Sequence, residues 1–208
     1  MKYSEILAEI QQLGRFTRHH GQSHRGITGT MAAGLAAGSY VYGIQFPSTA
    51  SGLYIPGWIH LHFVCLSAMT NAISAGRRLA LRRGTGGAFT GGSDIDVVSD
   101  LDATGAVPLG NPESFGTTDA EPACVGKVAS TAALTTSTSG GITFETAASK
   151  AMLLAHTGSA GQDYDELWTF DGLALLPGQS LGILAPAAFD AAGTWQLSVK
   201  GWGAVVQT

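Results

Sequence analysis

The stretch from Phe170 to Val206 constrains the fold most, because it contains two apolar runs separated by the turn-forming pair Pro177 and Gly178. Proline fixes φ for a tight turn, and glycine supplies the positive φ that some turns require. Farther on, large apolar side chains alternate with polar ones along Trp195, Gln196, Leu197, Ser198, Val199 and Lys200. This period of two predicts a strand with one buried face, which includes Trp195, and one solvated face. The chain is therefore predicted to end as strand, turn and strand in an antiparallel sheet.

Three earlier segments are also predicted to be strands. Residues 40–46 and 57–66 are rich in large apolar side chains, and residues 76–84 are bounded by glycine at each end. In the first of them, one face is predicted to carry Tyr40, Tyr42, Ile44 and Phe46. Residues 85–141 are mostly small and polar, so short strands are expected there, and residues 147–156 fit either a helix or a strand. Many short strands between turn signals predict an all-β fold, a jelly-roll-like β-sandwich.

The N-terminal residues have a different pattern, typical of a short amphipathic helix. Ser4 is a suitable N-cap, and four apolar side chains recur at helical spacing before Gly14: Ile6, Leu7, Ile10 and Leu13. A helix this short is marginal alone in water, so its apolar stripe is expected to need a partner surface. A polar, basic segment follows that contains Arg15 and Arg18. Residues 1–30 are therefore predicted to form a helix and an extended arm, and residues 31–208 the β-sandwich domain.

The low charge of the chain bears on its partners. Charged residues make up 12% of the 208, against the usual quarter, and the mean hydropathy is +0.18. Either much of the surface lies against other chains, or the protein is a small-residue β protein with a neutral surface. A net charge of −4 argues against nucleic-acid binding over the whole surface, although a local basic patch stays open. The sequence has no export signal and no apolar run of membrane-spanning length, so no membrane partner is expected.

Several titratable residues are candidates for a metal site. His60 and His62 lie two apart on one strand face, and His19, His20 and His24 follow the predicted helix. No carboxylate or cysteine stands nearby at a fitting offset, so these histidines are expected to be polar surface residues. Cys65 and Cys124 are too far apart for a zinc motif or a disulfide framework, which favours free thiols in a reducing compartment.

Two acidic clusters are alternatives for a calcium site: Asp94, Asp96, Asp100 and Asp102, and then Asp163, Asp165 and Glu166. Calcium prefers oxygen-rich loops, but the glycine and the closing glutamate of an EF-hand are missing. Solvated acidic loops are the expectation, with calcium at 94–102 left open. No metal and no cofactor are predicted.

The dense positive patch of the predicted sandwich comprises Arg77, Arg78, Arg82 and Arg83. On a strand these side chains would project to both faces, where they either contact an acidic partner or phosphate, or protect a sheet edge from pairing. The sequence contains no Gly-x-Ser-x-Gly elbow, and the glycines at 84–87 lack the lysine of a phosphate-binding loop. The protein is therefore predicted not to be an enzyme.

Two segments resemble a known family, the small jelly-roll structural proteins of tailed-phage virions that decorate or cement the head. Residues 31–46, a small-residue lead into an aromatic strand, resemble the start of that fold, and residues 176–183 and 192–202 resemble its closing hairpin. The resemblance covers a third to a half of the chain. It implies a non-enzymatic protein of the virion, assembled in the host cytoplasm, that forms a homo-oligomer, with a trimer favoured, and contacts the major capsid protein or neighbouring virion proteins.

The leading hypothesis is thus a capsid decoration, cement or head–tail protein that uses its sandwich for self-association and its arm to bind neighbours. The residues expected to contact partners are Ile6, Leu7, Ile10, Leu13, Arg15, Arg18, Arg77, Arg78, Arg82 and Arg83. The alternative is a carbohydrate-binding β-sandwich of a phage receptor-binding apparatus. In that case sugar rings would stack on exposed aromatic side chains, with these candidates: Trp58, Trp168 and Trp202.

Overall fold

The computed structural model describes residues 18–32, 34–69, 77–99, 124–136, 141–154, 159–189 and 193–207, and all regular secondary structure in them is β-strand. The strands are β1 (Arg18–Ile27), β2 (Met31–Ala32), β3 (Tyr40–Gln45), β4 (Leu53–Ser67), β5 (Arg77–Thr85), β6 (Phe89–Thr90), β7 (Ser93–Asp94), β8 (Asp96–Ser99), β9 (Val125–Val128), β10 (Thr135–Thr136), β11 (Thr143–Phe144), β12 (Lys150–Leu154), β13 (Asp163–Thr169), β14 (Gln179–Leu184) and β15 (Thr194–Gln207).

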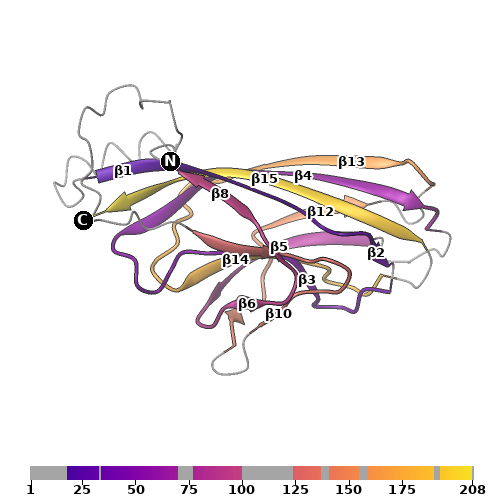
Figure 1. Cartoon of the computed structure of the whole chain (residues 1–208), viewed down its shortest axis with the longest axis horizontal. Coiled ribbons are helices and arrows are strands. Elements are labelled where there is room, and N and C mark those ends of the chain that lie inside the picture. The colour runs from indigo at the N-terminus through magenta and orange to yellow at the C-terminus, as the bar shows by residue number, and fades with distance from the viewer. Residues whose placement is uncertain are drawn as a thin grey trace.

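Two antiparallel sheets pack face to face to form a sandwich. Sheet A has the order β13-β4-β15-β1-β8, with β2 attached to β15. Sheet B has the order β11-β5-β14-β3-β9-β7, with β12 also paired to β5, and the short β6 and β10 pair with each other. Figure 1 shows the long strands β4, β13 and β15 in one layer and β3, β5 and β14 in the other.

Eight of the strands have the connectivity of a jelly roll. The first four of these strands pair with the last four in reverse order: β1 with β15, β3 with β14, β4 with β13 and β5 with β12. This is the pairing of one long hairpin that is folded over into two layers. The strands therefore alternate between the sheets, except where the chain passes from β5 to β12 within sheet B. The segment between these two strands adds β8 and β9 at the far edges of the sheets. The predicted all-β jelly-roll sandwich is confirmed.

The core lies between the sheets, where the predicted alternation is confirmed. Trp195, Leu197 and Val199 of β15 are fully buried, while the residues between them are partly exposed. Their neighbours on β4 are the buried Ile59, Leu61, Phe63 and Cys65. Trp195 stacks on Phe63 with ring centroids 5.0 Å apart. These two long strands thus form the centre of sheet A and contribute much of the apolar surface that drives folding.

The outer face of sheet B is covered by an aromatic cluster, Tyr40, Phe89 and Phe144, which packs on glycines. Gly43 and Gly182 lie directly opposite each other in β3 and β14. A Cβ atom on Gly43 would lie 2.2 Å from Phe89, and one on Gly182 would lie 2.7 Å from Tyr40. The rings therefore approach the sheet more closely than any side chain at these positions would permit.

Tyr40 does not share a face with Tyr42, which corrects the prediction for residues 40–46. Ile183 pairs with Tyr42 but Leu184 pairs with Tyr40, so Val41 is an extra residue in β3 and forms a bulge. A bulge reverses the alternation of side chains on one side of it. Tyr42 consequently points into the core, while Tyr40 stacks on Phe144 at 4.2 Å outside sheet B.

Residues 18–27, predicted to belong to the arm, are instead a central strand. β1 pairs with β15 along its whole length and with β8 on its other side. Its inward side chains include the polar Gln22 and His24, both buried, which is why apolar periodicity did not reveal it. Residues 1–17, with the predicted helix, lie outside the described residues.

The closing hairpin expected from the resemblance does not form. Gly178 has a φ of 80°, as the predicted turn requires, and β14 and β15 are both strands. However, β14 pairs with β3 and β5 in sheet B, whereas β15 pairs with β1 and β4 in sheet A. Before the turn, Leu175 forms an isolated bridge to Tyr54. The segment that fitted either helix or strand contains β12.

Candidate functional site

The arginines of β5 project to both sides of sheet B, as expected for a strand. Arg78 and Arg82 lie on the outer side, whereas Arg83 lies on the side of Leu181, with which it is in register. Arg78 is exposed, and Arg82 and Arg83 are half-buried. The side chain of Arg77 lies outside the described part of the structure. No single basic patch is formed by the three arginine side chains that are described.

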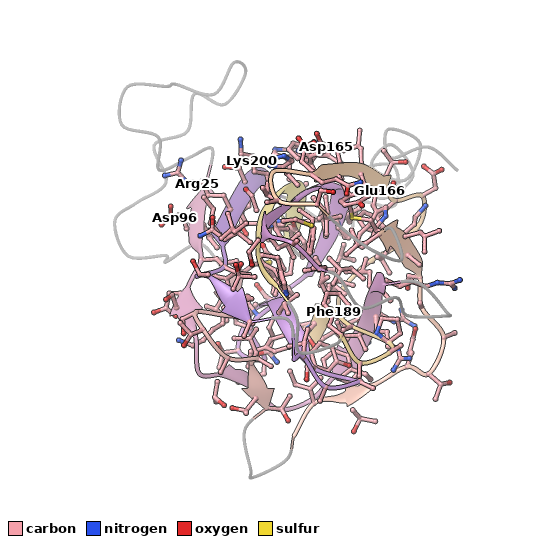
Figure 2. All side chains as sticks on the ribbon, turned by 90° about the vertical axis from the view of Figure 1, so that its right-hand side faces the viewer. Arg25, Asp96, Asp165, Glu166, Phe189 and Lys200 are labelled. Carbon is pink, nitrogen blue, oxygen red and sulfur yellow. The ribbon has the colours of Figure 1, made fainter. Side chains whose placement is uncertain are left out.

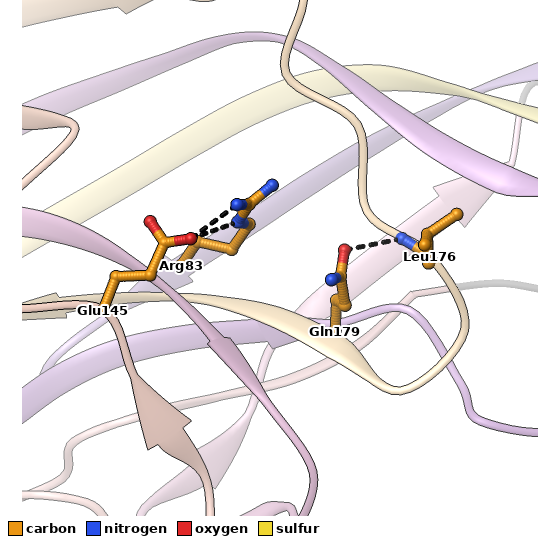
Figure 3. Close-up of polar contacts among 4 residues, drawn as sticks. All are labelled: Arg83, Glu145, Leu176 and Gln179. Atoms are coloured by element: carbon orange, nitrogen blue, oxygen red, sulfur yellow. Dashed lines mark hydrogen bonds and ion pairs between the residues drawn. The ribbon is translucent and has the colours of Figure 1, made fainter.

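Arg83 is paired within its own chain. Its Nε donates to Oε1 of Glu145 at 2.8 Å (Figure 3). The Glu145 N–H donates to the Arg83 carbonyl at 2.9 Å. A hollow of about 320 Å³ lies beside the pair, and its lining also includes Phe144 and Gln179. The Gln179 side-chain oxygen accepts from the N–H of Leu176 at 2.9 Å, which closes the Pro177-Gly178 turn (Figure 3). The hollow therefore has hydrogen-bonding groups in its wall but no net charge.

Arg82 interacts with the aromatic cluster over sheet B. Burial raises the pKa of the Tyr40 hydroxyl, and the charge of Arg82 and its hydrogen bond to Tyr40 oppose part of that rise. Arg82 is thus held by its own chain, like Arg83. Among the described arginine side chains of β5, Arg78 is the one exposed for a partner.

The remaining predicted partner-binding residues belong to the N-terminus. Ile6, Leu7, Ile10, Leu13 and Arg15 lie outside the described residues, so their role stays a prediction. Arg18 begins β1, and its backbone lies in register with Gln207 of β15.

The acidic residues Asp94 and Asp96 do not share a loop, which corrects that expectation. Asp94 lies in β7 of sheet B and Asp96 in β8 of sheet A, because the intervening Ile95 is buried and the chain crosses between the sheets there. Lys127 donates to Asp94 at 2.7 Å, and Arg25 donates to Asp96 at 2.9 Å. Each carboxylate therefore has its own cation. Asp100 and Asp102 lie outside the described residues.

Two histidine–aspartate pairs lie on the outer face of sheet A. Nε2 of His60 in β4 lies 3.0 Å from Oδ1 of Asp165 in β13, and Nε2 of His62 lies 3.3 Å from Oδ2 of Asp163. These are the histidines singled out in the sequence, and the structure brings them beside the second acidic cluster. Within the described ranges, no three His, Cys, Asp or Glu side chains are grouped as a metal ion would require.

The three tryptophans considered for sugar stacking separate into two groups. Trp168 is buried in the core, with 2% of its surface exposed, so it is not available to a ligand. Trp58 of β4 and Trp202 of β15 lie opposite each other. Trp58 is 36% exposed, and Trp202 is half-buried. These two form a pair on the outer face of sheet A.

Within the described residues, the sandwich has two open edges that the sequence did not reveal. In the described structure, β12 and β13 contact each other and end the two sheets on one side, while β8 and β9, with the short β7, lie at the other side. The first edge exposes Leu153 and Leu167, and the second exposes Val125 and, at the end of β1, Ile27. The alternation of Asp163 and Asp165 with Tyr164 could have indicated β13. Nothing local could indicate which strands would end the sheets.

A buried polar pair lies inside the core, between β1 and β3. Nδ1 of His24 is 2.5 Å from the Tyr42 hydroxyl. Burial lowers the pKa of His24 to about 4 and raises that of Tyr42 well above its usual value. Burial also raises the pKa of the nearby Cys124 thiol, which keeps it protonated and unreactive. These groups are therefore neutral at physiological pH and structural in character.

Two further observations bear on the assignment of this chain. No helix in the described ranges is long and apolar enough to cross a membrane. No protein-family model, no curated protein and no solved structure matches the chain.

Proposed function

We propose that this protein is a non-enzymatic structural subunit of a tailed-phage virion, a decoration or cement protein of the head or the head–tail region. It associates with copies of itself and with neighbouring virion proteins such as the major capsid protein. The observation that carries the proposal is the pair of open sandwich edges, each with two exposed large apolar side chains. The jelly-roll connectivity, which the family resemblance implied, supports it as an analogy of fold.

The edges favour contact between unlike surfaces of identical copies. The β12–β13 edge carries Asp163, Asp165 and Glu166 on exposed positions, and like charges oppose pairing of this edge with itself. The β8–β9 edge contains the ion pairs Arg25–Asp96 and Lys127–Asp94, whose charges balance, together with exposed Val125, so it has no such excess of negative charge. Joining the first edge of one copy to the second edge of the next gives a head-to-tail contact, which closes into a ring such as a trimer.

Two further parts of the chain are proposed to contact neighbouring proteins: the exposed Arg78 and the N-terminal residues 1–17. Arg78 projects from the outer side of sheet B, where it is available to an acidic group on a neighbouring virion protein. The predicted apolar stripe of Ile6, Leu7, Ile10 and Leu13 would bury itself against a neighbouring copy or the shell.

The test combines an edge variant with a count of copies in the particle. Leu153→Asp with Leu167→Asp places charge on the β12–β13 edge, and Leu176→Asp, at an exposed leucine in a turn, is the matched control. We expect the wild-type chain and the control to sediment as the same oligomer at micromolar concentration. The edge variant should sediment as a monomer and keep the same melting temperature.

In purified particles, mass spectrometry should find many tens of wild-type copies and a strong reduction for the edge variant. A wild-type chain that sediments as a monomer and is absent from the particle would contradict the proposal. A few copies per particle would instead favour a receptor-binding role.

A further inference from the structure

The hollow beside the Arg83–Glu145 pair is lined by a row of polar side chains on sheet B. Thr143, Thr85 and Gln179 stand directly opposite one another on the neighbouring strands β11, β5 and β14. Side chains in such a row point to the same side of the sheet, and Arg83, two residues before Thr85, points to that side as well. The hollow of about 320 Å³ is at the lower end of the range for ligand pockets, so it has room for a small ligand.

The row offers hydrogen-bonding groups that the protein itself does not use. Thr85 and Thr143 are both exposed, and among the described residues neither hydroxyl has a hydrogen-bond partner. The side-chain oxygen of Gln179 accepts from the Leu176 N–H at 2.9 Å, which fixes the amide and leaves its NH₂ group as a donor. Two hydroxyls and one amide donor therefore border the hollow.

The Arg83–Glu145 pair also has unused groups on both partners. Nε and Nη2 of Arg83 both donate to Oε1 of Glu145, at 2.8 and 2.5 Å. Oε2 of Glu145 and the N–H groups of Nη1 are left over, and Figure 3 shows the second carboxylate oxygen directed away from the guanidinium. Both side chains are partly exposed, at 38% and 45%. Because each partner holds the other, these groups are oriented before a ligand arrives.

The charge of the hollow selects a neutral ligand. Arg83 and Glu145 are the charged residues of its lining, and they balance. An anion would be repelled by the carboxylate and a cation by the guanidinium. The charged side chains labelled in Figure 2 belong to strands of sheet A and not to the strands of the hollow: Arg25, Asp96, Asp165, Glu166 and Lys200.

Among neutral ligands, the wall of the hollow suits a sugar better than a peptide. Each sugar hydroxyl both donates and accepts, so neighbouring hydroxyls can meet the Glu145 oxygen, the Arg83 N–H groups and a threonine together. Phe144 adds an apolar part to the lining, on which the C–H groups of a sugar ring can pack. A peptide would bind by adding a strand to the edge at β11, but this strand is two residues long and offers a short template.

We propose that this hollow binds a neutral saccharide. The hydroxyls of one sugar unit bond to Thr85, Thr143 and the free groups of the Arg83–Glu145 pair, and the Gln179 amide donates to a further sugar oxygen. The inference goes beyond the virion role and does not depend on it, because that role rests on the β12–β13 and β8–β9 edges.

The experiment titrates the full-length chain with three neutral tetrasaccharides, maltotetraose, cellotetraose and chitotetraose, using calorimetry. We expect at least one of them to bind, with an affinity that is the same at low and high salt because no net charge is involved. Thr85→Val and Thr143→Val each remove a hydroxyl and keep the shape of the side chain. Each should weaken that binding about fivefold, the effect of one neutral hydrogen bond. Thr169→Val, at an exposed threonine that ends β13, is the matched control and should have no effect.

Three results would overturn the inference. One is a folded chain that binds none of the three tetrasaccharides at millimolar concentration. Another is equal weakening by Thr169→Val and by the two variants in the hollow. The third is tighter binding of a neutral peptide, acetylated and amidated tetraglycine, which would make the hollow a peptide site. The edge variant with Leu153→Asp and Leu167→Asp should bind the sugar as the wild-type chain does, so the two proposals fail separately.

Discussion

Nδ1 of His24 lies 2.5 Å from the hydroxyl of Tyr42, a contact that joins β1 of sheet A to β3 of sheet B through the interior. Gln22, two residues earlier on the same face of β1, accepts a hydrogen bond from the backbone N–H of Cys124 at 3.0 Å. Both contacts hold a strand with polar inward residues in the middle of an otherwise apolar sandwich. A buried polar group without such a partner would cost free energy comparable to that of a lost hydrogen bond.

The first prediction concerns acid stability. The pKa of His24 falls from 6.5 to about 4 on folding, because the buried imidazole resists a charge. Between these values the unfolded chain binds more protons than the folded one, so the free energy of unfolding falls as the pH falls from 6.5 to 4. The full loss is about 3 kcal/mol for a shift of this size. Urea unfolding at pH 7, 6, 5 and 4 measures it.

His24→Gln supplies the control for this prediction, since glutamine does not titrate. The variant is expected to be less stable at pH 7, because the contact with Tyr42 changes, but its stability should depend less on pH between 6.5 and 4. Equal pH dependence of the two proteins would show that other groups cause the acid sensitivity.

The second prediction concerns the N-terminal boundary of the sandwich. Removal of residues 1–17 should leave a folded β protein with a nearly unchanged melting temperature, since β1 begins at Arg18. Removal of residues 1–30 should prevent folding, because it takes away the strand between β15 and β8 together with Gln22 and His24. Circular dichroism melts of the two truncated chains measure this. If the shorter deletion also unfolds the protein, residues 1–17 are part of its core.

The third prediction compares two tryptophans on neighbouring strands. Trp195 is fully buried and packs on Phe63 and Phe189, with ring centroids 5.0 and 5.7 Å away. Trp195→Ala should lower the free energy of unfolding by about 3–5 kcal/mol, as is usual for a buried large aromatic residue. Trp58→Ala, on the outer face, should cost much less. Chemical denaturation of both variants decides the point, and similar losses would mean that Trp58 is also structural.

The fourth prediction concerns the glycines beneath the aromatic cluster. Gly43 is not among the glycines with positive φ, so Gly43→Ala causes no backbone strain, but the new methyl would lie 2.2 Å from Phe89. Overpacking of this kind costs about 1–3 kcal/mol. Phe89→Ala removes the clash, so the double variant should be more stable than the sum of the two single changes predicts. Strict additivity in denaturation experiments would show that the ring moves aside freely.

The sequence was a good guide where apolar alternation is local. The inward residues of β15 and β4 follow from the two-residue period, and the Pro177-Gly178 pair predicted the turn that precedes β14. A strand that buries every second large side chain must show that period in its sequence, whatever it pairs with.

The sequence was a poor guide where a residue's partner lies far along the chain. Asp94 and Asp96 looked like neighbours in one acidic loop, yet the buried Ile95 sends them to different sheets and to different cations. The same holds for the arginines of β5, since Glu145, which pairs with Arg83, follows the inserted segment. Electrostatic roles depend on distances of a few ångströms, which sequence spacing does not supply.

By itself, therefore, the sequence determined an all-β sandwich of jelly-roll type and the buried faces of its long central strands, because these depend on local patterns of apolar residues. The tertiary structure alone decided that β1 is an inner strand of sheet A, that Tyr40 and Tyr42 face opposite ways, and that Trp58 and Trp202 lie opposite each other in β4 and β15. The reason is physical: burial of the polar Gln22 and His24 is favourable when Cys124 and Tyr42 meet them, and bulges at Val41 and Gly57 arise from strand pairing. Neither the hydrogen-bond partners of Gln22 and His24 nor the strand pairing at the bulges can be deduced from the residues adjacent in sequence.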